Sequence, residues 1–174
     1  MKCYRMADLP ADELFSNEVR RMILIELSSV EKRKYQNKFD EVKQIVDKLS
    51  KKELNYICNG TFKDSPYVVY RDIYYVGAEP AGFIDVYSFD KDDANIVLAV
   101  LKKYRNRGIA RSLVIDMEQK INVKSIKNLT WKTDLDNIAS QNLAKSLGYK
   151  LSETTKTSKI YRKPNPSYKG LKFI

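Results

Sequence analysis

Arg105, Gly108 and Ala110 occur at R-x-x-G-x-A spacing in a short basic stretch. The apolar run at 95–100 before this stretch predicts a β-strand, and the amphipathic pattern after it predicts a helix. The first backbone N–H groups of that helix have no partner within it and lie at the positive end of its dipole. Glycine allows a ligand to approach the backbone closely, and Arg105 and Arg107 add positive charge. This order predicts a phosphate-binding site; the alternative is an ordinary solvated turn.

The composition limits the chemistry that the chain can perform. Its 174 residues are 43% hydrophobic and 31% charged, which is typical of one globular domain. The absence of histidine excludes Ser-His-Asp and Cys-His catalysis and HExxH zinc sites. Cys3 and Cys58 lack CxxC spacing, and we expect no metal site. The two cysteines could pair, but in a reducing cytosol we expect two free thiols. Catalysis would have to use carboxylates, tyrosines, lysines, backbone dipoles or an ordered water.

The formal charge of +10 favours polyanionic partners such as coenzyme phosphates, nucleic acid or acidic proteins. The alternative is a set of scattered, solvated lysines on helix faces. The longest apolar runs are too short to cross a bilayer, and acidic residues within 8–13 stand where a signal peptide would have its apolar core. We therefore expect a cytoplasmic protein without a membrane partner.

The first 66 residues predict mainly helix. A short strand is expected at 2–6 and a helix from Pro10 onward, with acidic residues in its first turn. A capping box at 28–31 predicts the start of a second helix. The apolar stripe of this helix continues to an Asn-Gly pair at 59–60, so we expect one continuous helix over this range.

The rest of the chain predicts a sheet. Strands at 67–76, 81–88 and 95–100 are joined by short turns and indicate an antiparallel meander. The helix after the basic stretch then leads to a strand at 129–133, which indicates a parallel, right-handed βαβ unit.

A short helix should follow, capped by Asp136 or Asn137 and ended by Gly148. Strands at 149–154 and 158–162 indicate a closing hairpin. The sequence shows no repeat and no clear second domain. We therefore expect a single α+β domain over 1–174, made of an N-terminal part, a core and a tail, at 1–66, 67–162 and 163–174.

Two motifs of this chain together resemble the GNAT acyltransferase superfamily. Members carry an apolar strand followed by (Gln/Arg)-x-x-Gly-x-(Gly/Ala), which Arg105, Gly108 and Ala110 match. They also carry an asparagine eleven residues before a Gly-Phe-like pair, and this chain has Asn137 eleven residues before Gly148-Tyr149. The expected strand order agrees, and the likeness covers roughly 67–162.

The resemblance implies a three-layer α+β fold around a central mixed, mostly antiparallel sheet. The strands at 95–100 and 129–133 would splay apart to admit acetyl-CoA, with the strand backbone on the pantetheine arm and the basic loop around the pyrophosphate. The implied cofactor-binding residues are Leu98, Ala99, Val100, Arg105, Asn106, Arg107, Gly108, Ile109, Ala110, Arg111 and Asn137.

The resemblance also implies N-acetyl transfer to a primary amine by direct attack, with a strand amide polarising the thioester carbonyl. However, three positions at which members carry acid or base residues are occupied by Ala94, Lys132 and Ala144. These departures weigh against a protein N-terminus or a histone as acceptor. They favour a small molecule, such as a polyamine, amino acid or antibiotic, or a lysine side chain.

The remaining candidates for acid–base catalysis are Asp85, Asp93 and Asp134. Each has an alternative interpretation. Asp85 would be an outward, solvated strand position, Asp93 would shape a turn, and Asp134 would help to cap the next helix.

Two other functions remain open at this stage. The empty acid and base positions fit a non-catalytic coenzyme-A-binding regulatory module of the same fold. The charge of +10 and the many tyrosines fit a nucleic-acid-binding or tRNA-interacting domain. We expect a monomer or a homodimer in each case.

Overall fold

The computed structural model describes residues 38–60, 67–88, 92–123 and 126–169. The strand predicted at 2–6, the helix from Pro10 and the capping box at 28–31 lie outside the described residues. Within the described ranges, no helix is long and apolar enough to cross a membrane.

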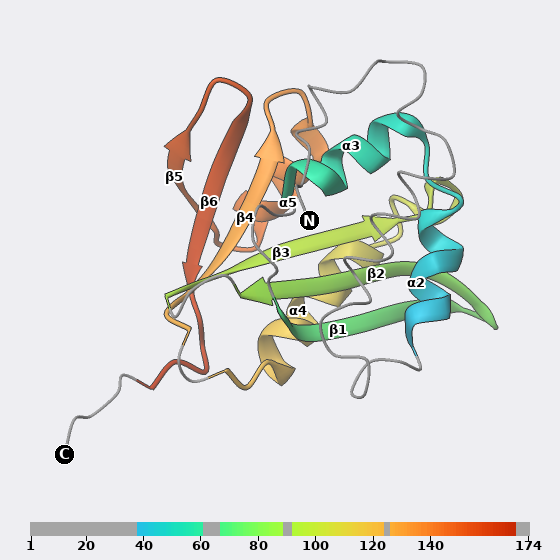
Figure 1. Cartoon of the computed structure of the whole chain (residues 1–174), viewed down its shortest axis with the longest axis horizontal. Coiled ribbons are helices and arrows are strands. Elements are labelled where there is room, and N and C mark those ends of the chain that lie inside the picture. The colour runs from blue at the N-terminus through green and yellow to red at the C-terminus, as the bar shows by residue number, and fades with distance from the viewer. Residues whose placement is uncertain (1–37, 61–66, 89–91, 124–125, 170–174) are drawn as a thin grey trace.

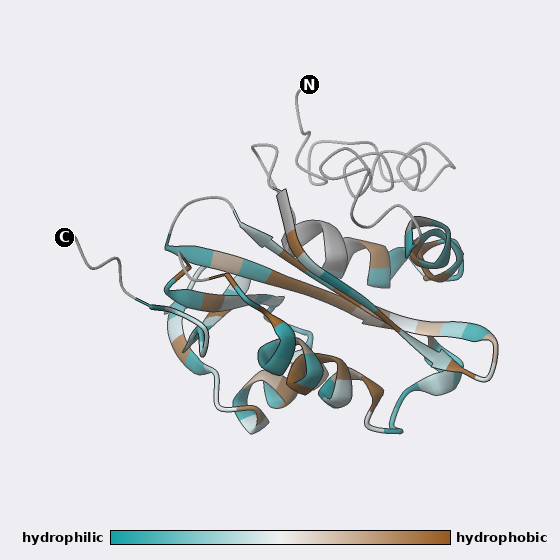
Figure 2. Ribbon diagram, turned by 90° about the horizontal axis from the view of Figure 1, so that it is seen from below, coloured by the Kyte–Doolittle hydropathy of each residue, from teal (hydrophilic) through white to brown (hydrophobic). Residues whose placement is uncertain are grey.

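The described chain forms three layers, with one six-stranded sheet between two layers of helices (Figure 1). Helices α2 and α3 lie on one face of the sheet, and α4 and α5 lie on the other (Figure 2). This arrangement confirms the predicted α+β class and the mixed, mostly antiparallel sheet. The elements in chain order are α2 (Phe39–Val46), α3 (Lys51–Gly60), β1 (Tyr67–Val76), β2 (Glu79–Ser88), β3 (Asp93–Val100), a 3-10 turn (Lys102–Tyr104), α4 (Ile109–Lys120), β4 (Asn128–Asp134), α5 (Ile138–Ser146), β5 (Lys150–Thr154) and β6 (Ser158–Pro164).

The sheet order is β1-β2-β3-β4-β6-β5, so the predicted meander and closing hairpin are both present. β2 begins two residues earlier than predicted because Glu79 pairs with Val76 across a two-residue turn. β6 continues past its predicted end at 162, because β4 pairs with it as far as Asn128 opposite Pro164.

The parallel contact between β3 and β4 is short. Only three residue pairs form, Asp93 with Asn128, Ala94 with Leu129 and Asn95 with Thr130. Beyond Asn95 the two strands diverge and leave a wedge between them (Figure 1). The predicted βαβ unit and the predicted splay of these strands are therefore confirmed.

The continuous helix predicted up to 59–60 is wrong, because the chain leaves the helical path between Val46 and Lys51. A second capping box starts α3 afresh. The backbone N–H of Ser50 donates to Glu53 Oε2 at 2.6 Å, and the Ser50 hydroxyl accepts from the Glu53 N–H at 3.4 Å. This reciprocal pair satisfies free N–H groups that an uninterrupted helix would not have.

A hydrophobic core cluster fills the space between the sheet and helices α4 and α5. Alternate residues of the central strands contribute to it, including Ile84 and Val86 of β2 and Leu129 and Trp131 of β4. The opposite face of β2 is buried as well, with Phe83, Asp85 and Tyr87 each at most 1% exposed. A central strand covered on both faces has no solvated side, so the outward, solvated position predicted for Asp85 is wrong.

Asp85 forms a buried ion pair with Arg71 of the neighbouring strand β1. Arg71 donates through Nε to Oδ1 at 2.7 Å and through Nη2 to Oδ2 at 2.8 Å, and the Tyr87 hydroxyl also donates to Oδ2 at 2.8 Å. Burial and the neighbouring carboxylate raise the pKa of Tyr87 well above its usual range. Burial lowers the pKa of Arg71, but the charge of Asp85 and the hydrogen bonds with Asp85 and Tyr87 together outweigh this effect and raise it. Asp85 is thus a structural anion.

We expect Asp85→Leu to lower the free energy of unfolding by about 3–5 kcal/mol, because Arg71 would remain as a buried, uncompensated charge. The double variant Arg71→Leu/Asp85→Leu should recover much of this loss. Lys43→Ala, which removes the exposed Lys43–Asp47 pair, should cost about 0.5 kcal/mol or less. Urea unfolding measures all three. A double variant less stable than Asp85→Leu alone would contradict this interpretation.

Candidate functional site

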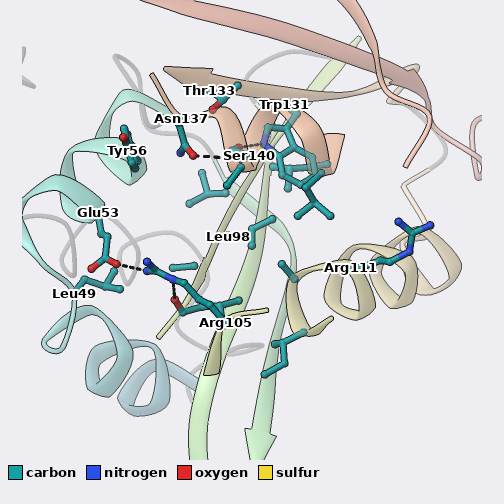
Figure 3. Close-up of a pocket in the computed structure, with 18 of the residues that line it drawn as sticks. Leu49, Glu53, Tyr56, Leu98, Arg105, Arg111, Trp131, Thr133, Asn137 and Ser140 are labelled. Atoms are coloured by element: carbon teal, nitrogen blue, oxygen red, sulfur yellow. Dashed lines mark hydrogen bonds and ion pairs between the residues drawn. The ribbon is translucent and has the colours of Figure 1, made fainter. Parts of the chain in front are cut away.

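The divergence of β3 and β4 opens a cavity of about 410 Å³ (Figure 3). Its walls come from both strands, from the loop that follows β3, and from α3, α4 and α5. Trp131 packs in the core beside α5 and donates from Nε1 to the Ser140 hydroxyl at 2.9 Å. By strand alternation Thr133 lies on the same side, whereas Lys132 and Asp134 lie on the α3 side. All of these residues line the cavity, so it passes from one face of the sheet to the other.

One end of the cavity is the N-terminus of α4. Gly108 is the N-cap residue with φ of +77°, a left-handed conformation that glycine adopts without strain, and no side chain caps the helix. The first helical hydrogen bond runs from the Ser112 N–H to the Gly108 carbonyl at 2.9 Å. In the described part of the chain, nothing accepts from the N–H groups of Ile109, Ala110 and Arg111.

This end has the geometry of an anion site. A Cβ placed on Gly108 would meet no atom within 4 Å, so the turn faces open space. Free N–H groups and the positive end of the helix dipole together favour a phosphate there. The local geometry that the sequence predicts is therefore present.

Arg105 has a different place from the one expected. Its Nε donates to the Val100 carbonyl at 2.9 Å, and its Nη2 pairs with the Glu53 carboxylate of α3 (Figure 3). The guanidinium thus holds α3 against the end of β3, and the Val100 carbonyl is already engaged. Arg105 lines the cavity, but its charge is partly neutralised by Glu53.

Arg107 does not line the cavity. Its guanidinium lies over the Tyr104 ring, with Cζ 5.6 Å from the ring centroid. Arg111 lines the cavity and donates from Nη1 to the Ser146 hydroxyl of α5 at 3.1 Å. The remaining residues of the predicted cofactor set also line the cavity, namely Leu98, Ala99, Val100, Asn106, Gly108, Ile109, Ala110 and Asn137.

Asn137 caps α5, as one of the two predicted alternatives. Its Oδ1 accepts from the Ser140 N–H at 3.2 Å, and Gly148 follows the helix with φ of +85° (Figure 3). The cap fixes the Asn137 side chain at the cavity wall. The side-chain amide nitrogen of Asn137, Nδ2, has no partner among the described residues, so it is a free hydrogen-bond donor.

Of the three candidate carboxylates, only Asp134 lines the cavity. Asp85 is held in its ion pair on the far side of β3. Asp93 lies where β3 and β4 are still paired, contacting Arg162 at 3.1 Å and accepting from Asn128 Nδ2 at 2.9 Å. Asp85 and Asp93 are therefore wrong as residues of this cavity.

Sequence reasoning missed the contribution of α3. Glu53 and Tyr56 line the cavity, and the Tyr56 hydroxyl donates to Asp136 Oδ2 at 3.2 Å. Lys52 contacts the same carboxylate at 2.9 Å. α3 thus bridges the loops that follow β3 and β4. The Ser-x-x-Glu capping box was the one local signal for this helix, and nothing in it indicates the partner across the cavity.

Thr133 was also missed. The residue is 5% exposed, and its hydroxyl has no hydrogen-bond partner in the described part of the chain. Because buried hydroxyls are nearly always paired in folded proteins, this unpaired hydroxyl at the cavity wall is a candidate for a polar contact with a ligand.

The sequence and the fold identify the family. Residues 30–149 match the sequence model of the acetyltransferase (GNAT) family, which is more than half of the chain. The chain therefore belongs to the GNAT acetyltransferase family. A search of curated proteins found no significant match.

Solved structures of this family share the fold at low sequence identity. The GNAT domain of S. lividans PAT aligns at 12% identity over 74% of this chain and 85% of that one, with a TM-score of 0.59. The ribosomal-protein-S18-alanine N-acetyltransferase of Escherichia coli aligns at 16% identity over 78% and 92%, with a TM-score of 0.54. An acetyltransferase from Thermus thermophilus aligns at 17% identity with a TM-score of 0.48. The alignment covers 54% of this chain and 62% of that one, so this chain spans less than two thirds of its length.

The link between α3 and the loop after β3 should depend on pH. Burial alone raises the pKa of Glu53, but hydrogen bonds from Ser50 and Arg105 outweigh it and lower the pKa below its usual value. The ionised carboxylate therefore stabilises the fold above the unfolded-state pKa of about 4.3, and this stability is lost as the pH falls through the folded-state pKa.

We expect Glu53→Gln to cost about 1–2 kcal/mol of unfolding free energy near pH 7, and the difference from wild type to shrink below about pH 4. Urea unfolding across this range measures the effect. Glu153→Gln, at an exposed position of β5, is the matched control. Parallel pH profiles for Glu53→Gln and wild type would refute the assignment.

Proposed function

We propose that this protein transfers an acetyl group from acetyl-CoA to a primary amine of a small molecule or a lysine side chain by direct attack. The observation that carries the proposal is the cavity between the diverging strands β3 and β4, with an uncapped helix N-terminus at one end. Family membership gives the class of reaction.

The cavity residues fit coenzyme A. The N–H groups of Ile109, Ala110 and Arg111 would hold the pyrophosphate. Past Asn95, the edge of β3 that faces away from β2 has no strand partner among the described residues, so its backbone groups would bind the pantetheine arm. The Asn137 amide nitrogen and the unpaired Thr133 hydroxyl supply further polar contacts. When bound, acetyl-CoA supplies the thioester acetyl group, and the products are the acetylated amine, coenzyme A and a proton.

The chain's own catalytic groups are few. Backbone N–H groups of β3 beyond Asn95 would polarise the carbonyl under attack. Asp134 would take a proton from the ammonium form of the acceptor, directly or through a water. Ala144 is buried and carries no acid, so the departing thiolate would take its proton from solvent.

A second candidate is a non-catalytic module that binds coenzyme A for regulation. The shortage of acid and base residues in the cavity favours this module. Asp85 and Asp93 lie outside the cavity, and Lys132 stands where family members place a carboxylate. An assay of thiol release from acetyl-CoA against a broad amine panel separates the two. Turnover with any amine supports the enzyme, whereas acetyl-CoA binding without turnover supports the module.

Gly108→Glu tests the donor site. A carboxylate there would repel the pyrophosphate, so we expect the acetyl-CoA Kd to rise about 10- to 100-fold relative to Gly108→Gln, an effect of about 1.4–2.8 kcal/mol. The two variants share the same backbone strain and side-chain size. Calorimetric titration measures both. Equal Kd values for the two variants would exclude a phosphate at this turn.

Thr133→Val removes the unpaired hydroxyl while keeping the side-chain shape. Without a ligand the variant should be as stable as wild type or more so, because a buried unsatisfied group is lost. Its acetyl-CoA Kd should rise about fivefold, since a hydrogen bond to the ligand is worth roughly 1 kcal/mol. Thermal unfolding and calorimetry give the two readouts, with Thr133→Ser expected to retain binding. An unchanged Kd would show that this hydroxyl contacts no part of the donor.

A further inference from the structure

The charged side chains that line the cavity differ in whether they have a hydrogen-bond or ion-pair partner. Glu53 and Arg105 neutralise one another, and Arg111 donates to Ser146 at the end next to α4. Asp134 already has a partner in the chain. Lys132 is exposed, and although its backbone lies in the β4–β6 ladder, its side chain makes no hydrogen bond or ion pair with any described residue. Among the cavity-lining cations it is the one whose side chain has no partner in the described residues, whereas Arg111 lies at the end next to α4.

The position of Lys132 places its ammonium away from the proposed donor phosphates. Lys132 is on β4 between Trp131 and Thr133, and these two face the α5 side of the sheet. Lys132 therefore faces the α3 side, from which Tyr56 also lines the cavity. The proposed phosphate site lies elsewhere, at the start of α4. The α3 side of the cavity is the side left for an acceptor.

We propose that Lys132 binds an anionic group of the acceptor, a carboxylate or a phosphate, while the acceptor's amine faces the acetyl group. This inference rests on the proposed acetyltransferase function and names its substrate class. An acceptor whose charges are all positive, such as a polyamine, would bring its ammonium groups beside an unpaired cation. An amine that also carries a carboxylate or phosphate pairs with Lys132 and leaves its own ammonium beside Asp134, two residues along the same strand face.

The test uses matched acceptors that differ only in the anion. Lysine is compared with 1,5-diaminopentane for the carboxylate, and phosphoethanolamine with ethanolamine for the phosphate. In the wild type we expect kcat/KM to favour the anionic member of at least one pair by about 10- to 100-fold, mainly through KM. The better pair distinguishes carboxylate from phosphate.

Variants at Lys132 complete the test. Lys132→Met should remove the preference, Lys132→Glu should reverse it, and Lys132→Arg should retain it. Lys150→Met, at an exposed position of β5 outside the cavity, removes the same net charge and should behave as wild type. Acetyl-CoA Kd values, measured for every variant, separate loss of the acceptor from loss of the donor.

The outcomes separate the two proposals. If the wild type acetylates both members of each pair equally, or if Lys132→Met and Lys150→Met behave alike, the role of Lys132 is overturned and the acetyltransferase stands. If no amine is acetylated, the enzyme proposal fails. Calorimetric titration of the same four amines into the coenzyme-A-loaded protein then shows whether Lys132 binds an anionic group. Loss of anionic-amine binding in Lys132→Met alone would support the anion site, and no binding to the wild type would overturn it.

Discussion

The three-pair ladder between β3 and β4 is the constraint on which the rest of the site depends. Backbone groups in a sheet need partners, and a central ladder that stops early leaves unpaired N–H and C=O groups inside the fold. Arg105 takes up one of them, the Val100 carbonyl. The remaining edge of β3 borders the cavity, where a ligand with alternating donors and acceptors would satisfy it. The cavity therefore follows from the backbone and not from any single side chain.

Helix α3 closes this wedge on one face of the sheet. It is tied to the loop after β3 by Glu53 and to the loop after β4 by Lys52 and Tyr56. Glu53 serves both the start of its own helix and Arg105, so one carboxylate positions both α3 and the basic loop. The proposed anion site at α4 would consequently rely on backbone N–H groups, because Arg105 is engaged elsewhere and Arg107 lies over Tyr104.

The net charge of the chain says little about the site itself. Much of the basic surface is paired, as in the cluster of Lys48, Lys103 and Tyr104 around Glu79, where hydrogen bonds from Lys103, Tyr104 and Lys48 lower the pKa of Glu79 to about 2. Inside the cavity, the electrostatic character depends on which charged side chains are paired with an opposite charge or a hydrogen-bond partner. The Lys132 side chain has no partner among the described residues. Its exposed ammonium therefore places an unpaired positive charge on the α3 side of the cavity, which the composition alone does not reveal.

The sequence by itself determined the local features, namely the strand–loop–helix unit that ends at Gly108, the Asn137 cap, the Gly148 stop and the short turns of the meander. These depend on backbone preferences and capping contacts within a few residues, and two such motifs at the right spacing were enough to indicate the family. Only the tertiary structure decided which side chains are buried or paired at long range. Asp85 is covered because both faces of β2 are packed, and Arg105 meets Glu53 from 52 residues away in the chain. The sequence pattern does not state which element covers which face, so it assigned Asp85 to solvent or catalysis and Arg105 to phosphate.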